Sequence, residues 1–287
     1  MVVLGFWTWL AFFSGGASYE DPHAGLTGCP HGEDLSTSFG TQDEDKALHG
    51  LWNWVPDLPE GHPPPRADLV RFYYFHEGGI GLYRYGRRGF NNTNSFDWQR
   101  KGNELWLKFR KTGATHKIPF RLQGDGEELA FEDDPRELGN ARYRRARGPV
   151  DAQLQFWPAR AMANLGQELD EEPTLSGHMW IDVKAYETGG MGFSMYQFAP
   201  AALDGRGVGW HHRGDFDDWS TETLEYRVEK SGLHLRFDRN QETHRTPFWL
   251  ERKEHTMLQM HSDPRNWWQR SEFVLMGKSF SAAEKAP

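Results

Sequence analysis

The sequence holds a single cysteine, Cys29, among its 287 residues. One cysteine excludes an intramolecular disulfide and any zinc site that needs several thiolates. The signatures of the common nucleotide-binding, hydrolase and protease classes are also missing: there is no P-loop, no Gly-x-Gly-x-x-Gly after a strand, no His-Glu-x-x-His and no Gly-x-Ser-x-Gly. The sequence therefore argues against these enzyme classes, and we expect no cofactor.

A surplus of positive charge is missing as well, since 33 Lys and Arg stand against 41 Asp and Glu and the formal net charge is −8. A nucleic-acid-binding protein normally carries a basic surplus or a basic stripe, and only Arg136 to Arg147 comes close to one here. We interpret that stretch as the solvated face of a strand. No nucleic-acid partner is expected.

Only one long apolar run occurs, Val2 to Phe13, and no Lys or Arg precedes it. It is too short to cross a bilayer as a straight helix, but its length suits a secretory signal, with Gly15-x-Ala17 as a cleavage site. Three interpretations stay open: a targeting or anchoring segment, an apolar arm buried against a barrel or a partner, and a segment foreign to the protein. The run favours an exported or membrane-associated protein over a cytoplasmic one, and a membrane or protein partner would dock through it.

Aromatic residues, in contrast, are abundant. Phe, Trp and Tyr make up 14% of the chain, with 13 tryptophans and 19 phenylalanines. Large flat side chains suit the faces of β-sheets and the walls of apolar cavities. A packed core is therefore expected.

The sequence also contains an internal repeat. The segment FRKTGATHKIPFRL, residues 109–122, aligns without gaps on FDRNQETHRTPFWL, residues 237–250, at a spacing of 128. The same spacing separates Trp52 from Trp180. Further along, Asp134-Pro135-Arg136 matches Asp263-Pro264-Arg265 at a spacing of 129. Several identities at one spacing indicate a tandem duplication.

Each copy has the periodicity of strands. Residues 104–109 and 233–237 alternate between apolar and polar side chains, and glycine-rich turns separate such runs. About eight short strands in each copy are typical of an up-and-down barrel. The predicted fold class is all-β: two tandem small antiparallel barrels joined by a short helical linker. The predicted parts are an apolar segment and polar leader (1–47), barrel 1 (48–148), the linker (149–175), and barrel 2 with a C-terminal tail (176–287).

The chain resembles lipocalin-like proteins of the calycin group at His49-Gly50-Leu51-Trp52, which is similar to their Gly-x-Trp opening, and at Phe96-x-Trp98. In that family the tryptophan plugs the closed end of the barrel, so the resemblance gives Trp52 and Trp180 a structural role. It also implies the binding of a small, mostly apolar ligand in the barrel. Some tandem lipocalin-like proteins instead catalyse isomerisation, cyclisation or hydration of hydrophobic substrates without a cofactor.

Two repeated histidines are candidates for ligand contacts. Alternation places His116 on the same face as Ile118 and Phe120, and it places His244 with Thr246 and Phe248. A histidine on an apolar face is most often a hydrogen-bonded structural residue. If the face lines an open cavity, the histidine becomes a ligand contact or a proton shuttle.

The segment from His211 to Asp218 is the densest set of potential metal ligands. Adjacent histidines on a strand point to opposite faces, so His211 and His212 rarely share one ion. Cys29-Pro30-His31 is a weaker possibility. We therefore predict no metal site.

A strand rich in cationic and aromatic residues offers the most specific binding hypothesis. The first copy has Tyr83, Arg84, Tyr85, Arg87 and Arg88 after Gly78-Gly79. At the matching place the second copy has Trp210, His211, His212 and Arg213 after Gly207-Val208-Gly209. Beside a cavity, these side chains would suit an anionic amphipathic ligand such as a carboxylate, through charge-assisted hydrogen bonds and stacking. The alternative is an outward-facing strand with solvated arginines.

Three functions are therefore carried forward. The first is the binding of a small apolar or amphipathic ligand. The second is a cofactor-independent isomerase, cyclase or hydratase acting in a barrel cavity. The third is an accessory subunit of a membrane-associated complex. A pocket with buried polar groups would favour the first two, and a filled barrel with a broad exposed aromatic patch would favour the third.

Overall fold

The structure is a computed structural model that describes residues 46–57, 63, 65–137, 139–147, 174–186, 190–252 and 254–278, all within one compact unit, Thr41–Pro287. Every regular element longer than a single turn in these residues is a β-strand. The expected helical linker, apart from residues 174–175, and the apolar run 2–13 lie outside the described residues. Among the described residues, no helix has the length and apolarity needed to cross a membrane.

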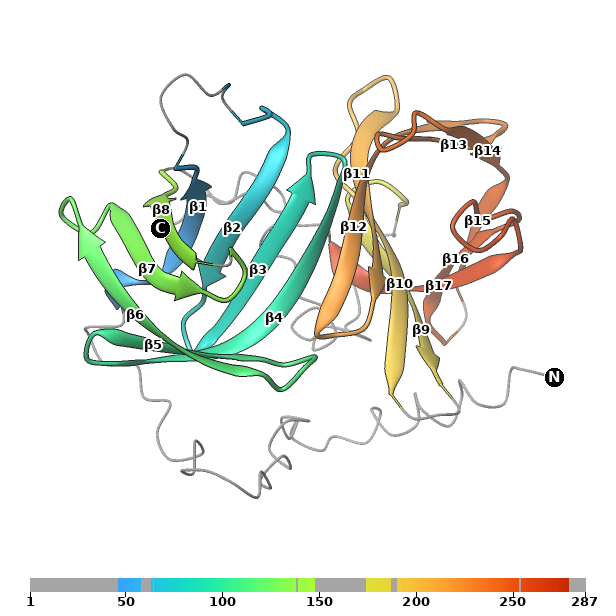
Figure 1. The fold of residues 1–287 in the computed structure, drawn as a ribbon. Coiled ribbons are helices and arrows are strands. Elements are labelled where there is room, and N and C mark those ends of the chain that lie inside the picture. Colours follow the sequence, from blue (N-terminus) through green and yellow to red (C-terminus); the bar gives the residue numbers. More distant parts are fainter. Residues whose placement is uncertain are drawn as a thin grey trace. The chain divides into compact units, whose positions relative to one another are not determined.

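The first eight strands close into an antiparallel barrel, the first barrel (Figure 1). Each strand pairs with the next one along the chain, and β8 pairs with β1. Their bounds are β1 (Gly50–Val55), β2 (Leu69–Phe75), β3 (Ile80–Arg87), β4 (Phe90–Lys101), β5 (Glu104–Phe109), β6 (Thr115–Gln123), β7 (Glu128–Asp134) and β8 (Gly139–Arg145). The predicted all-β antiparallel barrel is thus confirmed.

The remaining nine strands form the second strand set, which is also antiparallel. Consecutive strands pair from β9 to β14 and from β15 to β17, Pro247 separates β14 from β15, and β17 pairs with β9. The bounds are β9 (His178–Ala185), β10 (Met191–Phe198), β11 (Arg206–Gly214), β12 (Asp218–Glu229), β13 (Gly232–Phe237), β14 (Thr243–Thr246), β15 (Phe248–Arg252), β16 (Thr256–Met260) and β17 (Ser271–Lys278).

Alternating side chains fill the interior of the first barrel. In β5, the buried residues Leu105, Leu107 and Phe109 alternate with more exposed neighbours, as the period of a strand requires. They join a single core cluster that also holds the fully buried Trp52, whose Nε1 donates to the Leu48 carbonyl at 2.7 Å. Aromatic rings supply most of the volume of this core.

A buried carboxylate, Asp134, ties two core tyrosines together. Tyr73 donates its hydroxyl to Oδ1 at 3.0 Å, and Tyr143 donates to Oδ2 at 2.6 Å. Burial, and next the nearby charge of Asp134, raises the pKa of the Tyr73 hydroxyl well above its usual value. Burial likewise raises the pKa of the Tyr143 hydroxyl, so both tyrosines stay protonated and act as donors to the carboxylate.

We expect the Tyr143→Phe substitution to lower the free energy of unfolding by about 1–3 kcal/mol, because Oδ2 of Asp134 would stay buried without its donor. Urea denaturation followed by far-ultraviolet circular dichroism measures the change. Tyr186→Phe, at an exposed position, is the matched control. Equal stability of Tyr143→Phe and the control would contradict this view of Asp134.

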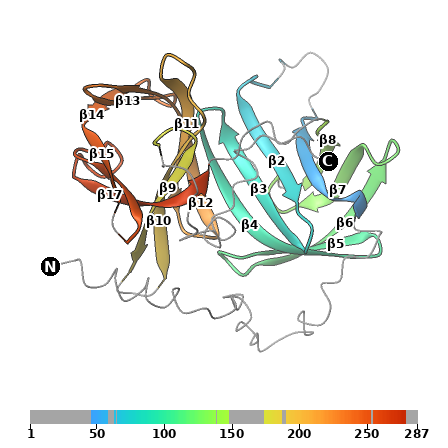
Figure 2. The ribbon, with the colours of Figure 1, turned by 180° about the vertical axis from the view of Figure 1, so that it is seen from behind.

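The first barrel and the second strand set are joined by a ribbon of two long strands, β4 and β12, which lie side by side in both views (Figures 1 and 2). The first halves of these strands pair with each other, Asn94 with Asp218 through Phe90 with Glu222, while their second halves pair with β5 and β13. At the centre, Asn92 faces Ser220, a residue 128 positions further along the chain.

The same arrangement repeats at the two ends of the ribbon. The Ser95 amide donates to the Asp217 carbonyl at 2.9 Å, and the Thr223 amide donates to the Gly89 carbonyl at 3.0 Å. Beside the ribbon, Leu82 on β3 belongs to a buried apolar cluster with residues of β9, β10, β12 and β17. The outer face of the first barrel is therefore buried here rather than solvated.

Candidate functional site

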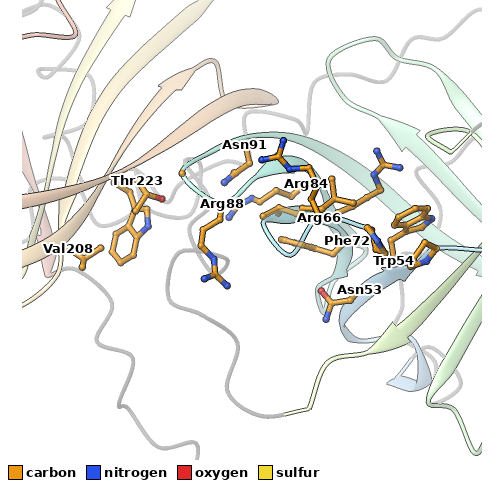
Figure 3. Close-up of a pocket in the computed structure, with 16 residues that line it drawn as sticks. Asn53, Trp54, Arg66, Phe72, Arg84, Arg88, Asn91, Val208 and Thr223 are labelled. Atoms are coloured by element: carbon orange, nitrogen blue, oxygen red, sulfur yellow. The ribbon is translucent and has the colours of Figure 1, made fainter. Parts of the chain in front are cut away.

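A pocket of about 530 Å³ lies where β1, β2 and β3 of the first barrel meet β11 and β12 (Figure 3). Four arginines line this arginine pocket, namely Arg66, Arg71, Arg84 and Arg88. No Asp or Glu is among the described residues that line it. Its apolar wall consists of Trp54, Leu69, Val70, Phe72, Val208 and Trp210.

Strand β3 positions Arg84 on the outside of the first barrel. Its neighbour Tyr83 belongs to the interior core, so alternation turns Arg84 to the opposite face, next to Phe72 on β2. That face is covered by the second strand set, and Arg84 is only 1% exposed. Its Nε donates to Thr93 Oγ1 at 2.8 Å, and its guanidinium lies 5.7 Å from the Phe72 ring centre.

The hairpin between β3 and β4 brings a second arginine to the pocket. Arg87 pairs with Phe90, which leaves the two-residue turn Arg88-Gly89. Gly89 has φ of +94°, a region that favours glycine, and a Cβ there would come within 3.2 Å of Asp238. The tight turn holds Arg88 exposed at the mouth, between Thr223 on one side and Arg84 on the other (Figure 3).

The remaining cations of the pocket are partly neutralised. Arg71 pairs with Glu137 at 2.5 Å and lies over the Trp54 ring at 4.7 Å, and Arg66 pairs with Asp68 at 3.0 Å. Trp210 on β11 is half-buried in the opposite wall. Two predicted ligand residues, Arg84 and Trp210, are thus brought into one pocket.

The two adjacent histidines point to opposite sides of β11. His211 Nε2 lies 3.0 Å from Ser194 Oγ, whereas His212 Nδ1 lies 2.9 Å from Thr221 Oγ1 and its Nε2 lies 3.3 Å from Gln197. They therefore share no site. In the part of the chain that the structure describes, no three His, Cys, Asp or Glu side chains gather in a way that could hold a metal ion.

Both histidines are neutral at physiological pH. Burial, followed by the charges of Arg265 and Arg213, lowers the pKa of His211 to about 3. Burial, followed by the charge of Arg84, lowers the pKa of His212 well below its usual value. Neither ring is suited to serve as a proton shuttle near pH 7.

The two predicted tyrosines lie on β3 of the first barrel. The Tyr83 hydroxyl donates to Glu137 at 2.7 Å, and burial, followed by this hydrogen bond, raises the pKa of Tyr83. Tyr85 is exposed and stacks on Tyr83, with 5.6 Å between ring centres. Neither tyrosine is among the residues that line the arginine pocket.

The repeated histidines occupy matching half-buried positions. His116 packs edge-on against Phe109, and His244 packs edge-on against Phe237, with 5.8 Å between ring centres in each pair. His244 Nε2 also lies 3.5 Å from Glu242. Neither histidine lines the arginine pocket, and these contacts are those of structural residues.

Sequence reasoning did not find Arg66, Arg71 and Asn91 as members of one pocket. They come from the segment before β2, from β2 and from β4, and nothing in the local sequence links them to Trp210. Arg88 was part of the cationic strand of the binding hypothesis, although it was not singled out as a ligand residue. The one available signal was that the strands of the pocket carry several arginines, although the chain as a whole is acidic.

Comparison of the chain with protein-family models, with curated proteins and with solved structures found no significant match. The functional conclusion therefore depends on the geometry of the pocket itself.

Proposed function

We propose that the chain binds a small amphipathic anion, such as a medium-chain carboxylate, in the arginine pocket. The observation that supports this most directly is the charge of the wall: four arginines line the pocket and no Asp or Glu is among the described residues that line it, although the whole chain has a net charge of −8. Such a concentration of one sign attracts the opposite charge. The proposal places the ligand outside the first barrel, because aromatic side chains fill that interior.

The two kinds of wall suit the two ends of such a ligand. Arg88 is exposed at the mouth and offers the paired N–H donors that bind a carboxylate in a bidentate manner. Phe72, Val208 and Trp210 offer apolar surface for the tail. Burial of a tail gains about 0.8 kcal/mol per methylene group, so a chain of moderate length contributes as much as the charged contact.

The proposal includes the lipocalin-like organisation: the second strand set would be a second copy of the first barrel. Equivalent contacts at the repeat spacing support it. Trp180 is fully buried like Trp52, and its Nε1 lies 3.4 Å from the Leu175 carbonyl. Likewise Arg136 lies over Phe109 at 3.9 Å, and Arg265 lies over Phe237 at 3.6 Å.

Isothermal titration calorimetry with decanoate, decanol and decylammonium tests the proposed function. The three probes have the same tail and differ only in the charge of the head. We expect decanoate to bind and the other two to bind at least about tenfold more weakly, since a charge-assisted hydrogen bond contributes about 1.5–3 kcal/mol. Equal binding of decanoate and decanol, or no binding of decanoate, would refute an anion site.

Two neighbouring arginines provide a matched pair of variants. Arg88→Gln should weaken decanoate binding about tenfold, because it removes the exposed guanidinium at the mouth. Arg87→Gln removes the same charge from the adjacent exposed position, which does not line the pocket, and should leave binding close to wild type. If the two variants weaken binding equally, the effect is one of overall charge and the assigned pocket is wrong.

A further inference from the structure

A second pocket, of about 350 Å³, lies where β9, β10 and β11 meet the segment between β16 and β17, and Lys111 from the turn after β5 also lines it. Asp182, Ser194, Arg213, Asp263 and Arg265 line it. Asp263 is only 1% exposed, and its Oδ2 has no hydrogen-bond partner among the residues that the structure describes. A buried carboxylate oxygen without a hydrogen-bond donor lowers the stability of the fold, so we expect a ligand to supply a donor to this oxygen.

The first barrel shows which partner is missing. In its ladder Tyr143 faces Leu129, and in the second strand set Phe273 faces Leu258, the residue 129 positions after Leu129. Phe273 therefore occupies the place of Tyr143 and lacks the hydroxyl that Tyr143 donates to Asp134 at 2.6 Å.

The other contacts of the two carboxylates agree. Asp263 Oδ1 accepts the Tyr196 hydroxyl at 2.8 Å and the Arg265 amide at 2.8 Å. Asp134 Oδ1 accepts the Tyr73 hydroxyl and the Arg136 amide in the same way. Only the second oxygen differs between the two sites.

The side chains around the unpaired oxygen are also smaller than their counterparts. Trp52 faces Tyr73 in the first barrel, and Trp180 faces Tyr196 in the second strand set, so these two pairs correspond. Two residues further along each ladder, Trp54 therefore corresponds to Asp182, and Arg71 corresponds to Ser194. In the first barrel Arg71 packs over Trp54. An aspartate and a serine leave much of that volume empty, and the pocket lies at this position.

The charges of the second pocket are balanced but not fully paired. Lys184 pairs with Asp182 at 3.2 Å, and Arg265 Nε pairs with Glu222 at 2.5 Å. Nη2 of Arg265 is buried and, among the described residues, has no acceptor. The pocket wall thus contains one acceptor without a donor, on Asp263, and one donor without an acceptor, on Arg265.

We propose that this second pocket binds a small zwitterion of the amino-acid type, with its ammonium group at Asp263 and its carboxylate at Arg265. Met191 and Phe193, which also line the pocket, provide an apolar wall for its side chain. The inference uses the proposed correspondence between the two strand sets, but it concerns a different pocket and a different ligand from the proposed function.

Calorimetric titration of the full chain with phenylalanine, leucine, phenethylamine and 3-phenylpropionate tests the ligand class. Phenethylamine lacks the carboxylate and phenylpropionate lacks the ammonium group. We expect at least one of the two amino acids to bind. If phenylalanine binds, each single-charge analogue should bind at least about tenfold more weakly than phenylalanine does. Failure of both amino acids to bind, or tighter binding of a single-charge analogue, would overturn the proposal.

Restoring the missing hydroxyl gives the sharpest variant. Phe273→Tyr supplies a donor to Asp263 Oδ2, so it should abolish amino-acid binding and raise the unfolding temperature. Asp263→Asn should weaken binding about tenfold or more, by removing the charge that the ammonium group requires.

Arg88→Gln should leave amino-acid binding unchanged, and Phe273→Tyr should leave decanoate binding unchanged, so failure here is distinguishable from failure of the proposed function. Wild-type amino-acid binding by Phe273→Tyr would refute the site.

Discussion

Replacing Trp52 with alanine is expected to lower the free energy of unfolding by about 3–5 kcal/mol, a large part of the total stability of an ordinary domain. Trp52 is fully buried in the core of the first barrel, donates to the Leu48 carbonyl, and lies under the Arg145 guanidinium at 4.3 Å. Its loss removes the apolar contacts, leaves a cavity and frees a carbonyl. Urea denaturation followed by far-ultraviolet circular dichroism measures the change.

Trp106 on β5 provides a control of the same size. It is half-buried and lies beneath Lys101 and Lys117 at 3.6 and 4.0 Å, so Trp106→Ala should cost about 1 kcal/mol. Trp180→Ala should resemble Trp52→Ala, because Trp180 is as deeply buried in the second strand set. Equal losses from Trp52→Ala and Trp106→Ala would contradict the special role of the buried tryptophan.

Lowering the pH from 7 to 5 is expected to destabilise the folded chain. His211 and His212 are buried and neutral, and their folded-state pKa values lie below the usual value of a histidine. Below about pH 6.5 the unfolded chain therefore binds protons that the folded chain cannot. Each histidine then lowers the free energy of unfolding by about 1.4 kcal/mol per pH unit, until the folded-state pKa is reached.

The charged groups around these rings agree with that direction. The charge of Arg84 acts on His212, and those of Arg213 and Arg265 act on His211. Glu222, which is opposite His211 in the ladder, is neutralised by Arg265. His211→Gln should reduce the slope of the free energy of unfolding against pH, between pH 6.5 and 5, by the contribution of one histidine, about 1.4 kcal/mol per pH unit. His234→Gln, at a half-buried position beside Glu229, should leave it unchanged. An unaltered slope in His211→Gln would show that other groups control the acid response.

Local sequence patterns were sufficient to predict much of the first barrel. The alternation of Leu105, Leu107 and Phe109 identified a half-buried strand, and it also predicted correctly that His211 and His212 point apart. These features depend only on the alternation of side chains along a strand, which can be recognised within one short strand segment. The burial of Trp52, in contrast, was expected from the resemblance of its segment to a Gly-x-Trp opening.

The candidate site could not be predicted in the same way. Alternation places Arg84 on the outside of the first barrel, where a solvated arginine is the ordinary expectation. It is buried only because β4 and β12 pair across the two strand sets, and no periodicity in the chain specifies that pairing. Likewise, the unpaired oxygen of Asp263 becomes visible only when its contacts are compared with those of Asp134.

The β4–β12 ribbon has one more consequence, which concerns its symmetry. The pairing places Asn92 opposite Ser220, and the residues 128 positions apart on either side exchange equivalent hydrogen bonds. Two identical subunits that meet about a twofold axis touch in this self-complementary manner. Here both surfaces belong to one polypeptide. The contact therefore does not depend on protein concentration, and dilution should not loosen it as it would a dissociable dimer.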